Sequence, residues 1–250
     1  MAGAAIHGRL SWLVAEVAGL VEETPRARSL ILNCPGWTGH RPGQHVDVRL
    51  TAADGYQAQR SYSIAAPADG ERVTITVERV ENGEVSSYLI DEARVGDRFE
   101  LRGPIGGYFV WEPGRGQPLL LVAGGSGIVP LMAMIRARLL TESGEPVRCV
   151  VSARSLEDVI YREELQRAAA RRDGIAVTTT LTRSQPEGWP GPSRRVDREM
   201  LSELGWPPSD RPLTFVCGPT GFVESVASAL VGLGHEPERV RTERFGPTGG

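Results

Sequence analysis

The chain changes its pattern near the middle, and this change restricts the folds that it can adopt. From Arg9 to about Arg102 the sequence holds short β-type runs separated by turn residues, with no long helical period. Beyond residue 118, apolar runs of strand length alternate with segments of helical spacing. A chain of 250 residues is long enough for two domains of about 100 to 150 residues each. We therefore expect one domain over residues 8–112 and a second over residues 118–250, separated by a Gly- and Pro-rich segment.

The first half predicts a small antiparallel barrel. Val73–Val77 alternates cleanly between apolar and polar residues, as a half-buried antiparallel strand does. Six short strands favour a closed barrel, because closure removes exposed sheet edges. The candidate strands are residues 10–17, 28–33, 45–50, 60–64, 73–80 and 99–102.

The second half predicts a parallel sheet with helices on both faces. Leu119–Ala123 is a continuous apolar strand, and the apolar spacing after it indicates a helix over Ile128–Leu140. In such a fold, ligands bind at the carboxyl ends of the strands. The further elements expected are strands at residues 147–152, 176–181 and 213–217 and helices at residues 157–170 and 221–230.

The charge balance argues against two large classes of partner. The sequence carries 28 basic and 31 acidic side chains, for a formal net charge of -3. Nucleic acid and anionic membranes attract strongly basic surfaces, so we expect neither as a main partner. An uncharged stretch, residues 116–135, approaches the roughly 20 apolar residues of a membrane span. Gln117, two prolines and a glycine run divide that stretch into strand, turn and helix.

Cysteine usage and the first residues indicate a cytoplasmic protein. Cys34, Cys149 and Cys217 are odd in number and widely spaced. This spacing fits free thiols in a reducing compartment and predicts no metal or iron–sulfur site. Residues 1–10 lack the basic start and the long apolar core of a secretory signal.

The most distinctive motif of the first half is Arg60-Ser61-Tyr62-Ser63, within a predicted strand. Alternation places Arg60 and Tyr62 on one face and the two serines on the other. A guanidinium suits a diphosphate, a phenol ring suits a planar heterocycle, and a serine hydroxyl can donate to a ring nitrogen. The same four residues also suit an ordinary barrel strand.

A second motif, Gly83-Glu84-Val85-Ser86-Ser87, leads into a short helical run at Tyr88–Ile90. Backbone N–H groups at a helix start can receive a phosphate, helped here by the Ser86 hydroxyl. Simple capping of the helix by Ser86 or Ser87 is the alternative explanation.

Two strand ends in the second half carry turns that open into helices. Gly124-Gly125-Ser126-Gly127 follows the first strand, and glycines let the backbone approach a diphosphate closely. Cys217-Gly218-Pro219 ends a later strand. A lone cysteine at such a position is usually a core residue. No Cys/His/Asp arrangement marks Cys217 as a covalent nucleophile.

Taken in order, these motifs resemble those of the ferredoxin–NADP reductase superfamily, from about Gly8 to Pro247. The resemblance implies an N-terminal antiparallel six-stranded β-barrel that binds FAD and a C-terminal α/β parallel-sheet domain that binds NAD(P). It also implies that the chain is an NAD(P)H-dependent flavoprotein reductase. The residues that carry it are Arg60-Ser61-Tyr62-Ser63, Gly83-Glu84-Val85-Ser86, Gly103-Pro104-Ile105-Gly106-Gly107-Tyr108-Phe109, Gly124-Gly125-Ser126-Gly127-Ile128-Val129-Pro130, Cys217-Gly218-Pro219 and Glu243-Arg244-Phe245.

The resemblance assigns roles to individual side chains. Arg60 would hold the flavin diphosphate, Tyr62 would lie against the isoalloxazine ring, and Ser63 would face its reactive N5 atom. Cys217 would stand near the nicotinamide C4 without covalent attachment. Phe245 would cover the flavin face that the nicotinamide must occupy, and residues 246–250 continue past it. The predicted catalytic residues are Ser63, Cys217 and Glu243.

Other segments complete the implied cofactor sites. Ser86 falls at a second phosphate contact, residues 77–80 would run beside the ribityl chain, and Gly124–Pro130 would lie beneath the nicotinamide nucleotide. The cofactor-binding residues are Arg60, Ser61, Tyr62, Ser63, Val77, Glu78, Val80, Gly83, Val85, Ser86, Ser87, Phe245, Gly125, Ser126, Gly127, Ser152, Arg154, Arg183, Cys217 and Gly218.

Coenzyme choice depends on Ser152-Ala153-Arg154, which follows the second strand of the nucleotide domain. A carboxylate at this location often binds the ribose hydroxyls of NAD, whereas Arg suits a 2'-phosphate. Arg154, together with Arg183, therefore favours NADPH over NADH.

We expect hydride to pass from NADPH to FAD, and electrons to pass from the reduced flavin to a separate redox protein such as a ferredoxin or an oxygenase component. The acceptor must be another molecule, because the chain lacks a cysteine cluster. A reductase of free flavin or ferric chelates is an alternative enzyme. A non-catalytic flavin-based redox-sensing module is an alternative of another class. Ser63, Cys217 and Glu243 argue against that module, since simple binding needs none of them.

Overall fold

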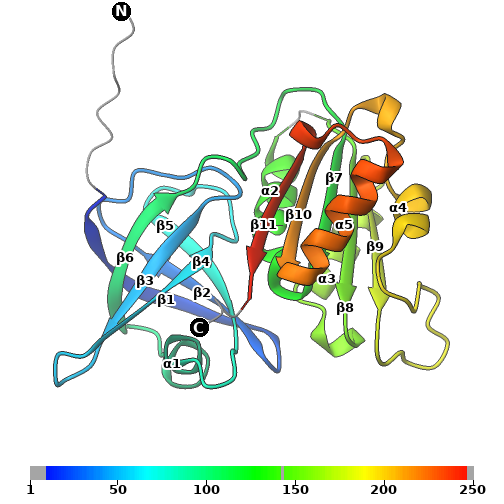
Figure 1. Ribbon diagram of the computed structural model, residues 1–250. Helices are drawn as coiled ribbons and strands as arrows, with labels where there is room; N and C mark the ends of the chain where they lie inside the picture. Colours follow the sequence, from blue (N-terminus) through cyan, green and yellow to red (C-terminus); the bar gives the residue numbers. More distant parts are fainter. Residues whose placement is uncertain (1–9, 142–143, 247–250) are drawn as a thin grey trace, which may run out of the picture.

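The computed structural model describes residues 10–141 and 144–246. Two domains lie side by side, a barrel-like antiparallel sheet and a three-layered α/β unit (Figure 1). Residues 1–9, 142–143 and 247–250 lie outside the described part, so the expectations for the first residues and for the tail beyond Gly246 are not addressed by it.

The N-terminal sheet has six antiparallel strands in the order β4-β3-β6-β1-β2-β5. An isolated antiparallel bridge between Ile64 and Ile75 brings the two edge strands together. The inward-facing residues form one apolar core that includes Leu30, Val48 and Leu101. The strands are β1 (Trp12–Thr24), β2 (Ala27–Asn33), β3 (His45–Thr51), β4 (Gln57–Ser63), β5 (Arg72–Glu78) and β6 (Arg98–Ile105).

The C-terminal sheet has five parallel strands in the order β11-β10-β7-β8-β9. The predicted fold class, a barrel followed by a parallel α/β domain, is confirmed. The strands are β7 (Leu119–Gly124), β8 (Val147–Ala153), β9 (Ile175–Leu181), β10 (Leu213–Pro219) and β11 (Val240–Phe245). The helices are α2 (Ile128–Leu140), α3 (Arg162–Ala170), α4 (Arg198–Leu204) and α5 (Thr220–Leu233).

Strand β7 is apolar throughout because both of its faces are covered. Leu119 and Leu121 pack in a core with α2 and α3, whereas Leu120 and Val122 pack in a second core with α4 and α5. The two helix pairs accordingly lie on opposite faces of the sheet (Figure 1). This double burial explains the continuous apolar run in the sequence.

The two domains share one apolar cluster. Barrel-side residues Ala65 and Phe109 belong to the same buried cluster as Phe215 of β10. The rings of Phe109 and Phe215 meet edge to face with centroids 5.1 Å apart. A guanidinium nitrogen, Nη1 of Arg241, donates to the carbonyl of Val110 at 2.6 Å. The domain seam is therefore packed rather than loosely tethered.

The helix predicted over residues 157–170 is wrong in its first part. A 3-10 turn, η3 (Leu156–Asp158), comes first, and α3 begins only at Arg162. Ser155 forms a capping box with Asp158 at the start of the 3-10 turn, and the extended backbone of Val159 ends it. Tyr161 then adopts a left-handed backbone with φ of 60°, which an α-helix excludes.

Three elements were not predicted, or were predicted incompletely. Helix α4 begins at an Asp197 cap that accepts from the N–H of Met200, and strand β11 pairs in parallel with β10. The short run near residue 88 is a four-residue helix, α1 (Glu84–Ser87), continued by a π-helix, η1 (Tyr88–Glu92). No helix in residues 10–141 and 144–246 is long and apolar enough to cross a membrane.

Candidate functional site

The carboxyl ends of β7, β10 and β11 meet at the seam with the barrel. Cys217 pairs in register with Ala123 of β7 on one side and with Glu243 of β11 on the other. Strand β11 is the edge of the parallel sheet that faces the barrel (Figure 1). The register therefore brings the predicted residues Cys217 and Glu243 together.

Two glycines let the backbone of this edge pack closely. A Cβ on Gly127 would lie 2.0 Å from the carbonyl oxygen of Cys217, so no side chain fits there. A Cβ on Gly218 would lie 3.1 Å from the carbonyl oxygen of Gly124. Gly125 has a φ of +57° and open space above it, with no described atom within 4 Å of its Cβ position. The turn is thus packed beneath and open above, as a phosphate-binding turn requires.

Cys217 and Glu243 form a protonatable pair. The Cys217 thiol donates to Oε2 of Glu243 across 3.9 Å. Burial raises the pKa of Glu243 to about 7. Burial and the neighbouring Glu243 carboxylate raise the pKa of Cys217 well above its usual range. The thiol is therefore protonated at neutral pH, which excludes a thiolate nucleophile at this position.

The predicted barrel motif lies on the edge strand β4. Arg60 is exposed, and its Nη1 donates to the carbonyl of the adjacent Gln59 at 2.6 Å. Within the part of the chain that the structure describes, no carboxylate forms an ion pair with Arg60. Tyr62 packs its ring partly against the barrel core, and burial raises the pKa of its hydroxyl. Ser63 ends the strand, half-buried and paired with His45 of β3.

Ser61 differs from its neighbours because its hydroxyl is used within the barrel. It donates to Oδ1 of Asp47 at 2.6 Å, and Arg102 donates to Oδ2 of the same carboxylate at 2.6 Å. Hydrogen bonds from Ser61 and Arg102 hold the pKa of Asp47 below its usual value, against the effect of burial. Asp47 supports β4 from the neighbouring strand. The sequence signal for it is an acidic residue between Val46 and Val48, opposite Ser61 in the sheet register.

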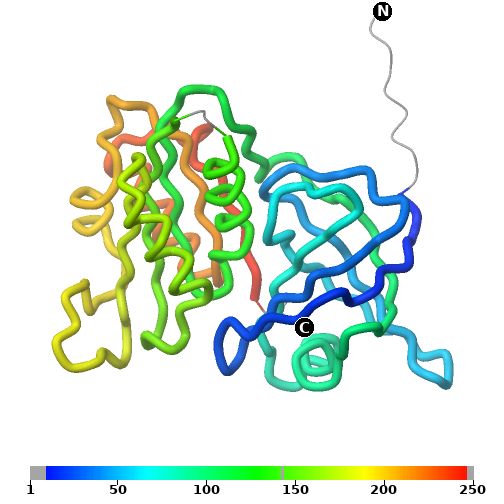
Figure 2. The backbone as a smooth tube through the Cα atoms, turned by 180° about the vertical axis from the view of Figure 1, so that it is seen from behind, coloured from blue at the N-terminus to red at the C-terminus, as the bar shows by residue number. Residues whose placement is uncertain are grey.

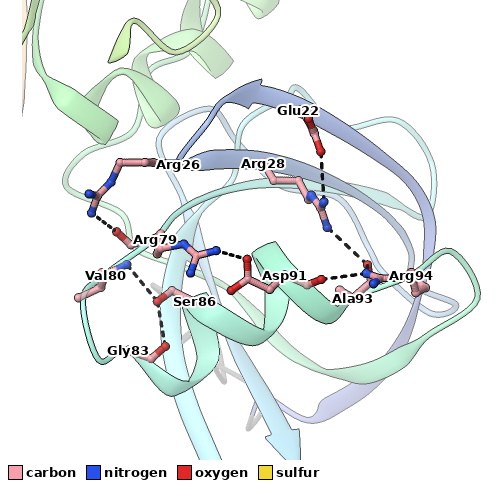
Figure 3. Close-up of polar contacts among 10 residues, drawn as sticks. All are labelled: Glu22, Arg26, Arg28, Arg79, Val80, Gly83, Ser86, Asp91, Ala93 and Arg94. Atoms are coloured by element: carbon pink, nitrogen blue, oxygen red, sulfur yellow. Dashed lines mark hydrogen bonds and ion pairs between the residues drawn. The ribbon is translucent and has the colours of Figure 1, made fainter. Parts of the chain in front are cut away.

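The predicted phosphate loop is closed by its own serine (Figure 3). The Ser86 hydroxyl accepts from the N–H of Val80 and donates to the carbonyl of Gly83, each at 3.2 Å. Ser86 thus holds the loop in shape, and Gly83, not a serine, is the N-cap of α1. The N–H of Ser87 donates to the carbonyl of Gly83 at 2.9 Å, so the N–H groups at the helix start that could receive an anion are those of Glu84, Val85 and Ser86.

Several predicted contacts are limited to the backbone. The side chains of Val77 and Val85 are buried in the barrel core, so only their main chain can face a ligand. Val80 is 62% exposed at the mouth of the loop. Glu78 and Ser87 are half-buried beside it.

The predicted coenzyme residues lie at the carboxyl ends of β8 and β9. The N–H of Arg183 donates to the carbonyl of Arg154 at 2.9 Å, which holds the two loops together. Both arginine side chains are exposed, and Ser152 is half-buried at the end of β8. Phe245, 36% exposed, ends β11 beside Pro219.

Comparison with known proteins identifies the family. The oxidoreductase FAD-binding domain family matches residues 28–110, and the oxidoreductase NAD-binding domain family matches residues 121–228. The chain is 36% identical over 209 residues to ferredoxin–NADP reductase B of Sorangium cellulosum, with 81% of this chain and 84% of that protein aligned. The chain belongs to the ferredoxin–NADP reductase superfamily. The resemblance inferred from the motifs is confirmed.

Other similar proteins include a reductase subunit and a flavohemoprotein, both longer than this chain. The chain is 34% identical to the glycine betaine monooxygenase reductase subunit of Pseudomonas aeruginosa, over 83% of this chain and 57% of that protein. It spans 51% of the length of a flavohemoprotein of Pseudomonas putida. The solved FAD/NAD-binding domain of a Vibrio cholerae nitric oxide dioxygenase superposes with a TM-score of 0.82 at 25% identity, over 94% of this chain and 99% of that one. The chain thus corresponds to the FAD- and NAD-binding parts of longer relatives.

The residues of this ferredoxin–NADP reductase superfamily member fit the two nucleotides. The exposed guanidinium of Arg60, which has no carboxylate partner among the described residues, lies on the edge strand β4 and suits the FAD diphosphate. The Gly125 turn leaves open space for a second nucleotide at the ends of the parallel strands. The chain is an FAD- and NAD(P)-binding oxidoreductase.

Proposed function

We propose that this chain takes hydride from NADPH onto FAD and passes electrons to a separate redox protein, a ferredoxin or an oxygenase component. The observation that carries the proposal is the arrangement of residues on the two sides of the domain seam. On one side lies the edge strand β4, where no carboxylate among the described residues forms an ion pair with Arg60. On the other side the buried Cys217 thiol and the half-buried Glu243 carboxyl group lie beside the Gly125–Gly127 turn.

The protein's own residues bind and orient the reactants. When bound, FAD supplies the chemistry that accepts a hydride and releases electrons one at a time. Arg60 holds the diphosphate, Tyr62 supports the ring system, and the Ser63 hydroxyl donates a hydrogen bond to the reactive ring nitrogen. Orientation of this kind supplies much of the rate acceleration in an enzyme whose cofactor does the redox chemistry.

Cys217 and Glu243 complete the seam on the coenzyme side. The buried thiol excludes water and gives the nicotinamide a neutral surface. Burial raises the pKa of Glu243 to about 7, so its carboxyl group is protonated below neutral pH and partly protonated at neutral pH. A neutral carboxyl there avoids placing an uncompensated buried charge against the rings.

Exposed guanidinium groups support the choice of NADPH. Arg154 and Arg183 lie on loops joined by a backbone hydrogen bond of 2.9 Å, and both side chains point to solvent from the strand ends. Two guanidinium groups suit the 2'-phosphate that distinguishes NADPH from NADH.

The small number of cysteines in the chain supports a separate electron acceptor. The chain has three cysteines, and all three are buried and unpaired. An iron–sulfur cluster is most often held by four cysteine thiolates, so these two domains do not supply one of that kind, and the next carrier lies outside them. Relatives named as reductase components of 3-ketosteroid-9-alpha-monooxygenase and of naphthalene 1,2-dioxygenase support an oxygenase system as that partner. Unpaired thiols also suit a cytoplasmic location.

Cytochrome reduction tests the proposed electron transfer. The holoenzyme with NADPH should reduce cytochrome c only when a plant-type ferredoxin or an oxygenase ferredoxin is added. Release of reduced free flavin without any protein acceptor would instead favour a flavin or ferric-chelate reductase. Ser63→Ala should slow flavin reduction several-fold while FAD stays bound, and loss of FAD from that variant would contradict the role of Ser63.

A further inference from the structure

A polar network on the α3 side of the domain seam ties the two domains together. It lies at a cleft of about 700 Å³ between the β1–β2 hairpin and the start of α3. The rear view shows this hairpin of the barrel close to the nucleotide domain (Figure 2). None of its members belongs to the nucleotide sites described above.

Arg136 of α2 is the centre of this network. Its Nε and Nη2 donate to the two carboxylate oxygens of Glu164 at 2.9 and 2.6 Å. Its Nη1 donates to the carbonyl of Ala65 at 2.8 Å, across the domain seam. The guanidinium carbon also lies 4.7 Å from the ring centroid of Tyr161. Three N–H groups of one planar fork are thus directed at fixed partners, a geometry that an ammonium group cannot reproduce.

Tyr161 makes a second connection across the seam. It is buried, and its hydroxyl shares a hydrogen bond with Oγ1 of Thr76 in the barrel. Thr76 continues to the Ser29 hydroxyl at 2.7 Å, and Ser29 donates to Glu23 at 2.6 Å. The left-handed backbone of Tyr161, with φ of 60°, places the ring beneath Arg136. A non-glycine residue keeps such a strained conformation only where its surroundings fix it.

The hydrogen bond between Arg136 and Ala65 joins two segments that are continuous with the proposed redox site. Ala65 follows Ser63 by two residues, and its N–H is held by the carbonyl of Thr74 at 2.7 Å. At the other end, α2 begins at Ile128, directly after the Gly125–Gly127 turn. Arg136 therefore joins the strand that carries Ser63 to the helix that follows the coenzyme turn.

We propose that Arg136 is a positioning residue for hydride transfer, because its contacts with Ala65 and Glu164 fix the flavin strand relative to the coenzyme turn. The inference rests on the proposed function. Since a displacement of about 1 Å at the reacting atoms can cost about a hundredfold in rate, loss of this contact should slow the transfer step. Arg136 is not among the residues assigned to either nucleotide, so FAD content and NADPH affinity should change little.

The test is rapid mixing of oxidised holoenzyme with NADPH in the absence of oxygen. The limiting rate of flavin bleaching reports hydride transfer, and its dependence on NADPH concentration reports the dissociation constant. The variants are Arg136→Ala, Arg136→Lys and the double change Arg136→Met with Glu164→Leu. The double change replaces the ion pair by apolar side chains, which usually preserves folding. Arg167→Ala is the matched control, because Arg167 lines the same cleft and its ion pair with Glu163 is exposed.

The expected result is a limiting rate at least about tenfold lower in Arg136→Ala and in the double variant. FAD content and the NADPH dissociation constant should stay within about twofold of the wild type. The long-wavelength charge-transfer absorption of nicotinamide on flavin should weaken, Arg136→Lys should recover part of the rate, and Arg167→Ala should behave like the wild type.

A limiting rate within about twofold of the wild type in an FAD-loaded double variant would overturn the positioning role of Arg136 but not the proposed function. So would equal slowing by Arg167→Ala. A wild-type protein whose flavin is not bleached by NADPH would overturn the proposed function as well. These outcomes separate the two proposals.

Discussion

The Cys217 thiol and the Glu243 carboxylate face each other in register on parallel strands β10 and β11, with Sγ 3.9 Å from Oε2. Burial is the main cause that raises the pKa of both groups, and the Glu243 carboxylate raises the pKa of the thiol further, whereas the hydrogen bond from Cys217 partly lowers the pKa of Glu243. The result at neutral pH is a neutral thiol beside a carboxyl group that is poised to titrate. This relationship makes the seam sensitive to pH in a way that single substitutions can test.

Stability should fall with rising pH because of Glu243. Its pKa is about 7 in the folded protein and near the ordinary value of 4.5 when unfolded. The folded state therefore binds the extra proton between these values, and the stabilisation is full below pH 4.5 and lost as pH rises through about 7. The effect is at most about 3 kcal/mol. Urea unfolding between these pH values should show this decline in the wild type, and Glu243→Gln should flatten it.

Cys217→Ala should retain turnover. The thiol is 1% exposed and its pKa is well above the usual range, which argues against a covalent nucleophile and fits the positioning role proposed for it. Hydride transfer should slow by about tenfold or less, whereas loss of a nucleophile costs about 10⁴-fold or more. The limiting rate of flavin reduction measures the difference, and a dead but folded, FAD-bound variant would refute the positioning role.

Gly127→Ala should destabilise the coenzyme domain. Its Cβ would lie 2.0 Å from the carbonyl oxygen of Cys217, so the backbone of β10 or of the turn must move. The cost should be at least about 2 kcal/mol in the free energy of unfolding. Gly221→Ala is the control, because no described atom lies within 4 Å of that Cβ position. If both variants unfold at the same urea concentration as the wild type, the close approach at Gly127 is not rigid.

Replacing both Arg154 and Arg183 by Ala should weaken NADPH use selectively. Loss of charged hydrogen bonds to the 2'-phosphate should raise the KM for NADPH by about tenfold or more. The KM for NADH should hardly change. Arg171→Ala, at an exposed pair with Asp173, should affect neither coenzyme. A wild-type catalytic efficiency with NADH equal to that with NADPH would contradict the assignment.

The sequence predicted those helices and strands whose signals lie within the element or directly beside it in the chain. The helix Ile128–Leu140 has the predicted bounds, because a glycine turn begins it and its apolar spacing is regular. Tyr161 could not be predicted, since its left-handed turn is fixed by Thr76 and Arg136, which are distant in the chain. Helix α4 and strand β11 were not predicted because their local signals are weak. Helix α4 is short and is capped by the Asp197 side chain, and β11 forms by pairing with β10.

The site could be anticipated as a set of motifs but not as a set of contacts. Sequence placed Ser61 and Ser86 among the cofactor residues, yet the structure directs their hydroxyls to Asp47 and to the Val80–Gly83 loop. These partners depend on sheet register and loop closure, which no single motif encodes. Arg136 carried no motif at all. The individual site residues and the domain limits at residues 112 and 118 stay predictions.

The central claim is that hydride passes to FAD at the seam between barrel and parallel sheet. The most direct measurement is the flavin absorption of the purified holoenzyme after anaerobic mixing with one equivalent of NADPH. The account predicts that the yellow protein bleaches within the time of one catalytic turnover. A flavin that stays oxidised over that time, or a colourless protein that cannot be reconstituted with FAD, would contradict it.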